Sequence, residues 1–179
     1  GAANDPSPYN DTPATINNYA QWGDAAIGLR AVATGGNATA LGRSARAAAA
    51  NAIAIGGGNG SDANNNTEKT EATGEKSTAI GYNAKAGAEK STAIGAGATA
   101  LGESAFAGSG ATASGSYSVA IGKATASGGQ SISIGKDSEA TDNGTIAEGD
   151  RSKAKAGGGI AIGYDGQALN INATAVGSE

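Results

Sequence analysis

The stretch Ser77-Thr78-Ala79-Ile80-Gly81-Tyr82-Asn83-Ala84-Lys85-Ala86 contains the pattern that decides the fold of this chain. Variants of its Ala-Ile-Gly tripeptide recur along the 179 residues, most of them 13 or 14 residues apart. The glycines that end the copies are Gly28, Gly42, Gly56, Gly81, Gly95, Gly122, Gly163 and Gly177, with degenerate copies at Gly108, Gly135 and Gly149. A unit of about 14 residues therefore repeats from residue 24 to the end, with one insertion after Gly56.

The residues before each glycine alternate in type, as in a β-strand with two different faces. Counting back from the glycine, positions −1 and −3 are mainly aliphatic or β-branched, and position −2 is usually Ala. We predict that position −1 lies in the core, at Ile27, Leu41, Ile55, Ile80, Ile94, Ile121, Ile134, Ile162 and Val176. Because small side chains let two backbones approach closely, we predict a subunit interface at position −2, formed by Ala26, Ala40, Ala54, Ala79, Ala93, Ala120, Ala161 and Ala175.

The second half of each unit also alternates. Small residues occupy positions +3 and +5, while position +4 is often charged, as at Arg46, Lys85 and Lys153. This pattern predicts a strand with its alanines inside and its charges in water. The whole chain is therefore expected to be all-β, a parallel β-roll with two short strands in each 14-residue coil.

Composition excludes several classes of protein. The chain has no His and no Cys, which removes most nucleophilic and zinc chemistry. Its net charge of −4 offers no basic surface for nucleic acid. With one Phe and no Met it cannot build a conventional layered core. We therefore expect no enzymatic activity, no catalytic residue, no metal and no cofactor.

The repeated unit resembles the head repeats of the YadA-type trimeric autotransporter adhesins, and the resemblance extends over residues 24–179. It implies a left-handed roll, assembly with two identical chains into a homotrimer, and display on the outer membrane of a bacterium. The expected partners are host matrix proteins such as collagen, fibronectin or laminin. Direct membrane contact by this segment is not expected.

Some heads of this family bind collagen through an Asn-Ser-Val-Ala-Ile-Gly-x-x-Ser unit. The nearest match here begins Tyr117-Ser118-Val119-Ala120-Ile121-Gly122, so Tyr replaces the Asn. The resemblance implies Tyr117, Ser118 and Val119 as candidate ligand contacts.

Three segments depart from the repeat. Residues 1–23 contain all three prolines and the single Trp, and we predict an N-terminal cap in which Trp22 seals the roll. An inserted polar loop is expected near 57–74. Glu148 stands at the predicted inward position −1, so either the strand is shifted or bulged there, or the carboxylate is buried beside a partner such as Arg151.

The sequence thus predicts a non-enzymatic surface adhesin involved in virulence. A surface-templating solenoid, as in ice-binding proteins, is the alternative, but the threonines at position −3 are expected to face inward. A hexapeptide-repeat acyltransferase would need arcs of six residues and normally a catalytic His, which this chain lacks.

Overall fold

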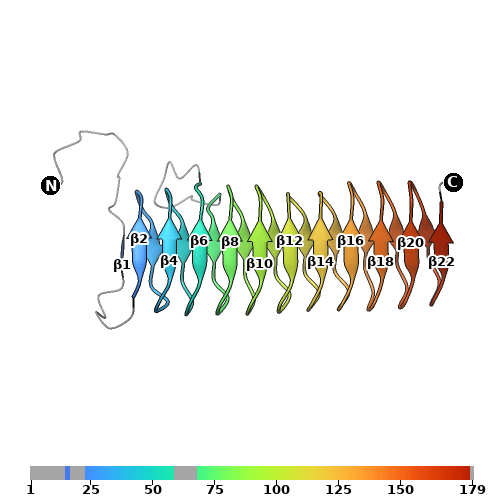
Figure 1. Cartoon of the computed structure of the whole chain (residues 1–179), viewed down its shortest axis with the longest axis horizontal. Coiled ribbons are helices and arrows are strands. Elements are labelled where there is room, and N and C mark those ends of the chain that lie inside the picture. The colour runs from blue at the N-terminus through green and yellow to red at the C-terminus, as the bar shows by residue number, and fades with distance from the viewer. Residues whose placement is uncertain (1–14, 17–22, 59–67, 178–179) are drawn as a thin grey trace.

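The computed structural model describes residues 15–16, 23–58 and 68–177. Within them the chain is a parallel β-solenoid in which each full coil adds one strand to each of two sheets (Figure 1). Sheet B contains the strands β2 (Ala25–Ile27), β4 (Thr39–Leu41), β6 (Ile53–Ile55), β8 (Thr78–Ile80), β10 (Thr92–Ile94), β12 (Phe106–Gly108), β14 (Val119–Ile121), β16 (Ile132–Ile134), β18 (Ile146–Glu148), β20 (Ile160–Ile162) and β22 (Thr174–Val176). Sheet A contains β1 (Thr15–Ile16), β3 (Val32–Ala33), β5 (Arg46–Ala47), β7 (Glu71–Ala72), β9 (Lys85–Ala86), β11 (Thr99–Ala100), β13 (Thr112–Ala113), β15 (Thr125–Ala126), β17 (Glu139–Ala140), β19 (Lys153–Ala154) and β21 (Gln167–Ala168). The predicted parallel roll is confirmed.

Each strand pairs in parallel with its equivalent in the next coil, so like residues form ladders along the rod. Ala79 lies beside Ala93, for example, and Ile80 beside Ile94. Sheet A begins with β1, which pairs with β3 although it belongs to the segment predicted as a cap. Trp22 lies outside the described residues.

The insertion leaves the pairing intact. Strand β5 pairs with β7, and β6 pairs with β8, so the extra residues lie between β6 and β7. Residues 59–67 of the predicted polar loop are outside the described part of the chain.

The interior of the roll contains only small side chains, which reverses the predicted faces of sheet B. The alanines predicted as a subunit interface are the core: Ala40, Ala54, Ala79, Ala93, Ala120 and Ala161 are at most 1% exposed, and Ala26 and Ala175 pack against them. The residues predicted as the core face outward: Ile27, Leu41, Ile94, Ile121, Ile134 and Val176 are exposed, and Ile55, Ile80 and Ile162 are partly exposed. Both predictions were wrong.

The reason is the narrowness of each coil. The alanines in and next to the sheet A strands, such as Ala86 in β9 and Ala84 just before it, are fully buried as predicted, and they face the alanines of sheet B. Protein interiors are close-packed, so a space filled by methyl groups from both sheets has no room for an isoleucine. The larger side chains at −1 and −3 therefore lie outside.

In several coils a buried hydroxyl occupies position −4 of the sheet B strand. Ser118 donates to the carbonyl of Gly115 over 2.6 Å, Ser131 to Gly128 over 2.7 Å, and Thr145 to Asp142 over 2.6 Å. Each hydroxyl thus bonds a carbonyl of the turn three residues earlier, which satisfies both groups away from water.

The turns depend on glycine where successive coils approach. Gly81 has a φ of +125°, and a Cβ there would lie 2.7 Å from the backbone of Gly95. At Gly115 an added Cβ would lie 1.9 Å from the carbonyl oxygen of Gly128. Only a residue without a side chain allows this stacking.

Two local predictions need correction. Gly108 is paired with Ile94 and Ile121, so it occupies position −1, and Ser109 takes the place of the repeat glycine. Phe106 accordingly lies at position −3, and both coils that follow are one residue shorter. Glu148 is exposed and in register with Ile134 and Ile162, so the strand is neither bulged there nor host to a buried carboxylate.

The narrow interior predicts the effect of a larger core side chain. Ala93→Leu should reduce the free energy of unfolding by roughly 3 kcal/mol, because the added carbons have no space between the sheets. Ala96→Leu, at an exposed turn position of the same coil, should change it little. Urea denaturation followed by circular dichroism would compare the two, and equal stabilities would contradict the face assignment.

Candidate functional site

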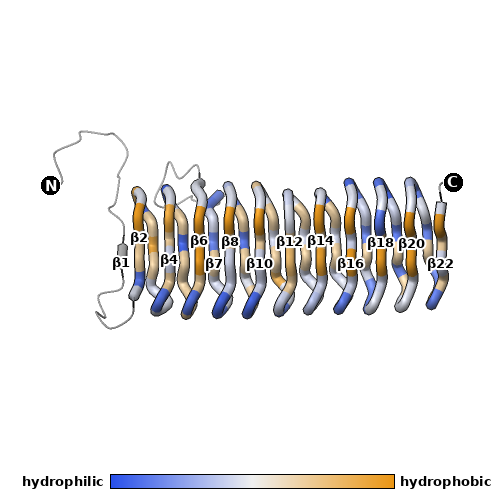
Figure 2. Tube along the Cα trace, in the orientation of Figure 1, coloured by the Kyte–Doolittle hydropathy of each residue, from blue (hydrophilic) through white to orange (hydrophobic). Residues whose placement is uncertain are grey.

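The outer face of sheet B is apolar along most of the rod. Its exposed or partly exposed side chains come from positions −1 and −3 of successive strands, and Figure 2 shows orange along most even-numbered strands. Those with more than a third of their surface exposed are Ile27, Leu41, Ile53, Ile94, Ile121, Ile134 and Val176. A contiguous apolar surface of this kind is typical of a protein interface.

On this outer face of sheet B, a large side chain at position −3 fills the space that a glycine leaves at position −1 of the same strand. At β12 the residue at −1 is Gly108, and the ring of Phe106 at −3 extends over it, 3.4 Å from where a Cβ would lie. The face therefore stays filled although one ladder lacks a side chain. Glu148 is the single acidic residue among positions −1 and −3 of the sheet B strands.

The outer face of sheet A is polar. Its outward residues at position +4 include a run of alternating charge at Arg46, Glu71 and Lys85, which pair in register. Arg46 lies 3.6 Å and Lys69 3.1 Å from a carboxylate oxygen of Glu71. The prediction that the charges at +4 face outward is confirmed. Three threonines, Thr99, Thr112 and Thr125, follow in consecutive strands.

The turn before each sheet B strand, here called the entry turn, has two residues at its corner. The second has a positive φ throughout, as at Lys76 (57°), Lys90 (57°) and Tyr117 (58°). In two coils the pair is Glu-Lys, with nitrogen–oxygen distances of 2.6 Å for Glu75–Lys76 and 2.7 Å for Glu89–Lys90. The hydrogen bond and charge of Lys90 lower the pKa of Glu89.

The turn after each sheet B strand is here called the exit turn, and two of the exit turns contain a contact between an aromatic and a charged side chain. Arg151 lies 2.6 Å from a carboxylate oxygen of Asp165, and its guanidinium lies 4.4 Å from the centre of the Tyr164 ring. The hydrogen bond to Asp165 raises the pKa of Arg151. Tyr82 donates a hydrogen bond to the Glu68 carboxylate, one coil earlier.

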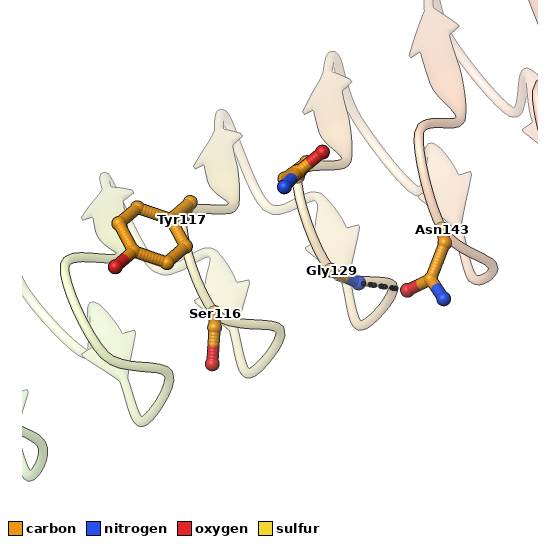
Figure 3. Close-up of a pocket in the computed structure, with 5 residues that line it drawn as sticks. Ser116, Tyr117, Gly129 and Asn143 are labelled. Atoms are coloured by element: carbon orange, nitrogen blue, oxygen red, sulfur yellow. Dashed lines mark hydrogen bonds between the residues drawn. The ribbon is translucent and has the colours of Figure 1, made fainter.

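A shallow pocket of about 350 Å³ lies over three successive entry turns (Figure 3). Ser116, Tyr117, Gly129, Gln130 and Asn143 line it. The Asn143 amide oxygen accepts a hydrogen bond from the Gly129 N–H over 2.9 Å. Sequence reasoning missed this pocket, because it depends on which entry turns lack long charged side chains.

The predicted ligand contacts do not form one surface. Tyr117 is 57% exposed at the pocket, but Ser118 is fully buried and bonded to Gly115. Val119 is partly buried on the outer face of sheet B. Direct contact of a ligand with Ser118 is therefore ruled out in the folded coil, and that prediction was wrong.

The repeated sequence that forms these ladders matches a known protein family. The pattern described as the YadA head domain repeat (two copies) matches residues 25–43, 33–59, 72–98, 107–125 and 126–152, more than half of the chain. The chain belongs to the YadA head family. YadA heads are adhesin-type, surface-displayed domains of autotransporters and not enzymes. No curated protein sequence gave a match.

The part of the chain that the structure describes contains no helix that could span a lipid bilayer. Among the same residues of this YadA head, no three His, Cys, Asp or Glu side chains gather as they would around a metal ion.

The contact between Tyr82 and Glu68 predicts a pH effect. The hydrogen bond to the Glu68 carboxylate raises the pKa of Tyr82, and desolvation and the negative charge of Glu68 raise it further. This raised pKa favours the folded state below the ordinary tyrosine pKa, and the benefit is lost as pH rises through the folded-state value. Glu68→Gln should lower the pKa of Tyr82.

A pH titration of ¹³C-labelled tyrosine by NMR would measure this pKa. Tyr82→Phe assigns the signal, and the Tyr164 signal should titrate identically in both proteins. An unchanged Tyr82 pKa in Glu68→Gln would show that the contact is absent in solution.

Proposed function

We propose that the chain forms the head of a trimeric bacterial surface adhesin that binds host matrix or cell-surface proteins. Three copies would pack through the outer faces of their sheets B, with the left-handed winding that the family implies and display at the outer membrane. The observation that carries the proposal is the exposed aliphatic surface along sheet B.

The chemistry of the two outer faces supports this arrangement. Seven large aliphatic residues of sheet B are more than a third exposed, whereas the equivalent surface of sheet A has charged and hydroxyl side chains. Burial of apolar area contributes about 25 cal/mol per Å². An interior of alanines provides little of this per residue, so packing the aliphatic face against two copies would add the stabilisation that a single roll lacks.

Adhesion would then use the remaining surfaces, sheet A and the turns. Three parallel rods present each surface feature three times, so weak contacts with a repetitive partner such as collagen would be reinforced by avidity. Fibronectin and laminin are further candidates of the same class.

A surface-templating function has one observation in its favour. The threonines at position −3, such as Thr78 and Thr92, face outward rather than inward as expected, and Thr99, Thr112 and Thr125 form a ladder on sheet A. That ladder has only three rungs and lies between Lys85 and Glu139. The charged residues at both ends limit the regular threonine surface to three strands, so adhesion is the better-supported function.

The proposed assembly predicts the molecular mass of the protein in solution. In sedimentation equilibrium the protein should have three times the 16.9 kDa of one chain. Ile94→Asp combined with Ile121→Asp should yield a folded single chain, because two charges per protomer would be buried in the seam. Thr99→Asp combined with Thr125→Asp, on the outer face of sheet A, should remain trimeric. A monomeric wild type, or a trimeric Ile94/Ile121 variant, would refute the proposed seam.

The adhesive function predicts binding that depends on this assembly. On surfaces coated with collagen, fibronectin or laminin, the wild type should bind at least one protein, and the Ile94/Ile121 double variant should bind it at least tenfold more weakly. The Thr99/Thr125 variant controls for added charge. No binding to any of the three would overturn the matrix-protein assignment.

A further inference from the structure

The entry turns change in character along the rod. From β8 to β10 their corners contain Glu75–Lys76 and Glu89–Lys90, whose paired side chains fill the corner. From β14 to β18 the corners are Ser116–Tyr117, Gly129–Gln130 and Asn143–Gly144. The pocket lies over these three uncharged corners. It lies where three successive corners have no charged residue and two of the six corner residues are glycines.

The three corners are held in fixed register. The N–H of Tyr117 donates to the carbonyl of Glu103, that of Gln130 to Ser116, and that of Gly144 to Gly129, at 2.8–2.9 Å. Stacked strands are about 4.8 Å apart, so the pocket presents the side chains of three different corners at that interval, a spacing suited to a ligand that extends along the rod.

The lining offers an aromatic face beside neutral hydrogen-bonding groups. The Tyr117 ring is 57% exposed, and its hydroxyl donates to a carboxylate oxygen of Glu103 over 3.3 Å. An aromatic face is electron-rich and attracts the polarised C–H groups on one side of a pyranose. The amides of Gln130 and Asn143 and the hydroxyl of Ser116 are donors and acceptors suited to sugar hydroxyls. A volume of about 350 Å³ is at the lower end for small-molecule sites.

Charge restricts the kind of sugar. None of the five lining residues is charged. The two charged residues hydrogen-bonded to them are acids: Glu103, which accepts from Tyr117, and Asp142, which accepts from the Asn143 N–H over 2.7 Å. Carboxylates beside the pocket would repel sialylated or sulfated glycans.

We propose that this pocket binds a neutral glycan, stacked on Tyr117 and held by Ser116, Gln130 and Asn143. The inference rests on the proposed adhesive function, for which it names a second class of host ligand beside matrix protein. Contact with a sugar requires the exposed ring but not the tyrosine hydroxyl, which is bonded to Glu103.

The test uses lactose, N,N′-diacetylchitobiose and maltose as neutral probes and 3′-sialyllactose as the acidic one, each titrated into ¹⁵N-labelled full-length chain and followed by NMR. At least one neutral disaccharide should shift the Asn143 side-chain amide and the backbone N–H signals of Tyr117 and Gln130, with saturable binding. The sialylated probe should bind at least tenfold more weakly.

Matched variants assign the site. Tyr117→Asn places at this corner the residue found there at Asn37, Asn51 and Asn172, so the turn is preserved while the ring is lost. Gly129→Glu combined with Gln130→Lys rebuilds the ion pair of other coils in the pocket. Both should weaken binding at least tenfold. Tyr117→Phe should retain it, as should Tyr164→Asn, which removes a tyrosine that is 50% exposed in an exit turn.

The outcomes separate this inference from the proposed function. If no neutral disaccharide binds, or if Tyr117→Asn binds as wild type does, the glycan site is refuted while adhesion to matrix protein can persist. Tighter binding of the sialylated probe also refutes it. If a collagen-like triple-helical peptide shifts the Tyr117 and Gln130 signals and the disaccharides do not, the pocket is a peptide site instead. Loss of matrix adhesion with glycan binding retained would refute only the matrix-protein assignment.

Discussion

The close approach of the two sheets inside each coil is the constraint on which the rest of the structure depends. Ala79 and Ala93 from sheet B meet Ala86 of sheet A and Ala84 just before that strand, all fully buried. Interior positions vary only among small residues, such as Ala38 and Thr145 at position −4, because a larger side chain in one coil would disturb the stacking of its neighbours. The large differences between coils therefore lie on the outer faces and in the turns.

The outer faces of the two sheets therefore differ in chemistry. Sheet B presents aliphatic ladders, in which even the gap at Gly108 is covered by Phe106. Sheet A has ionic rungs such as Arg46 and Glu71, with threonines between the charged regions. Association and recognition can then evolve on separate surfaces, since a change on either face leaves the alanine interior untouched.

The repeat period and the alternation within each unit predicted the solenoid, its two sheets and the outward charges of sheet A. Alternation cannot say which face of a sheet B strand is inside. Placing the bulkier side chains inward follows the usual rule for a core, but this rule fails where the interior is narrower than an isoleucine. The small residue at position −2 of every sheet B strand, Ala in all but β16, was consistent with a narrow interior, yet it suits an intersubunit seam equally well. The pocket at Tyr117 could not be predicted from the sequence, because it depends on how residues 13 and 14 positions apart stack in the folded chain and on the absence of side chains between them.

At the corner of the entry turn, successive coils share one backbone conformation but differ in side chain. Its backbone is left-handed in coil after coil, a conformation in which Asn and Gly are favoured and bulky residues are strained by about 1 kcal/mol or more. Asn37, Asn51 and Gly144 follow that preference. Lys76 and Lys90 depart from it and form an ion pair within the turn. Tyr117 departs furthest, with most of its ring surface in water and its hydroxyl on a carboxylate one coil away. A bulky, exposed side chain on this left-handed backbone is the feature that makes the Tyr117 ring the first contact to test for the glycan proposed above.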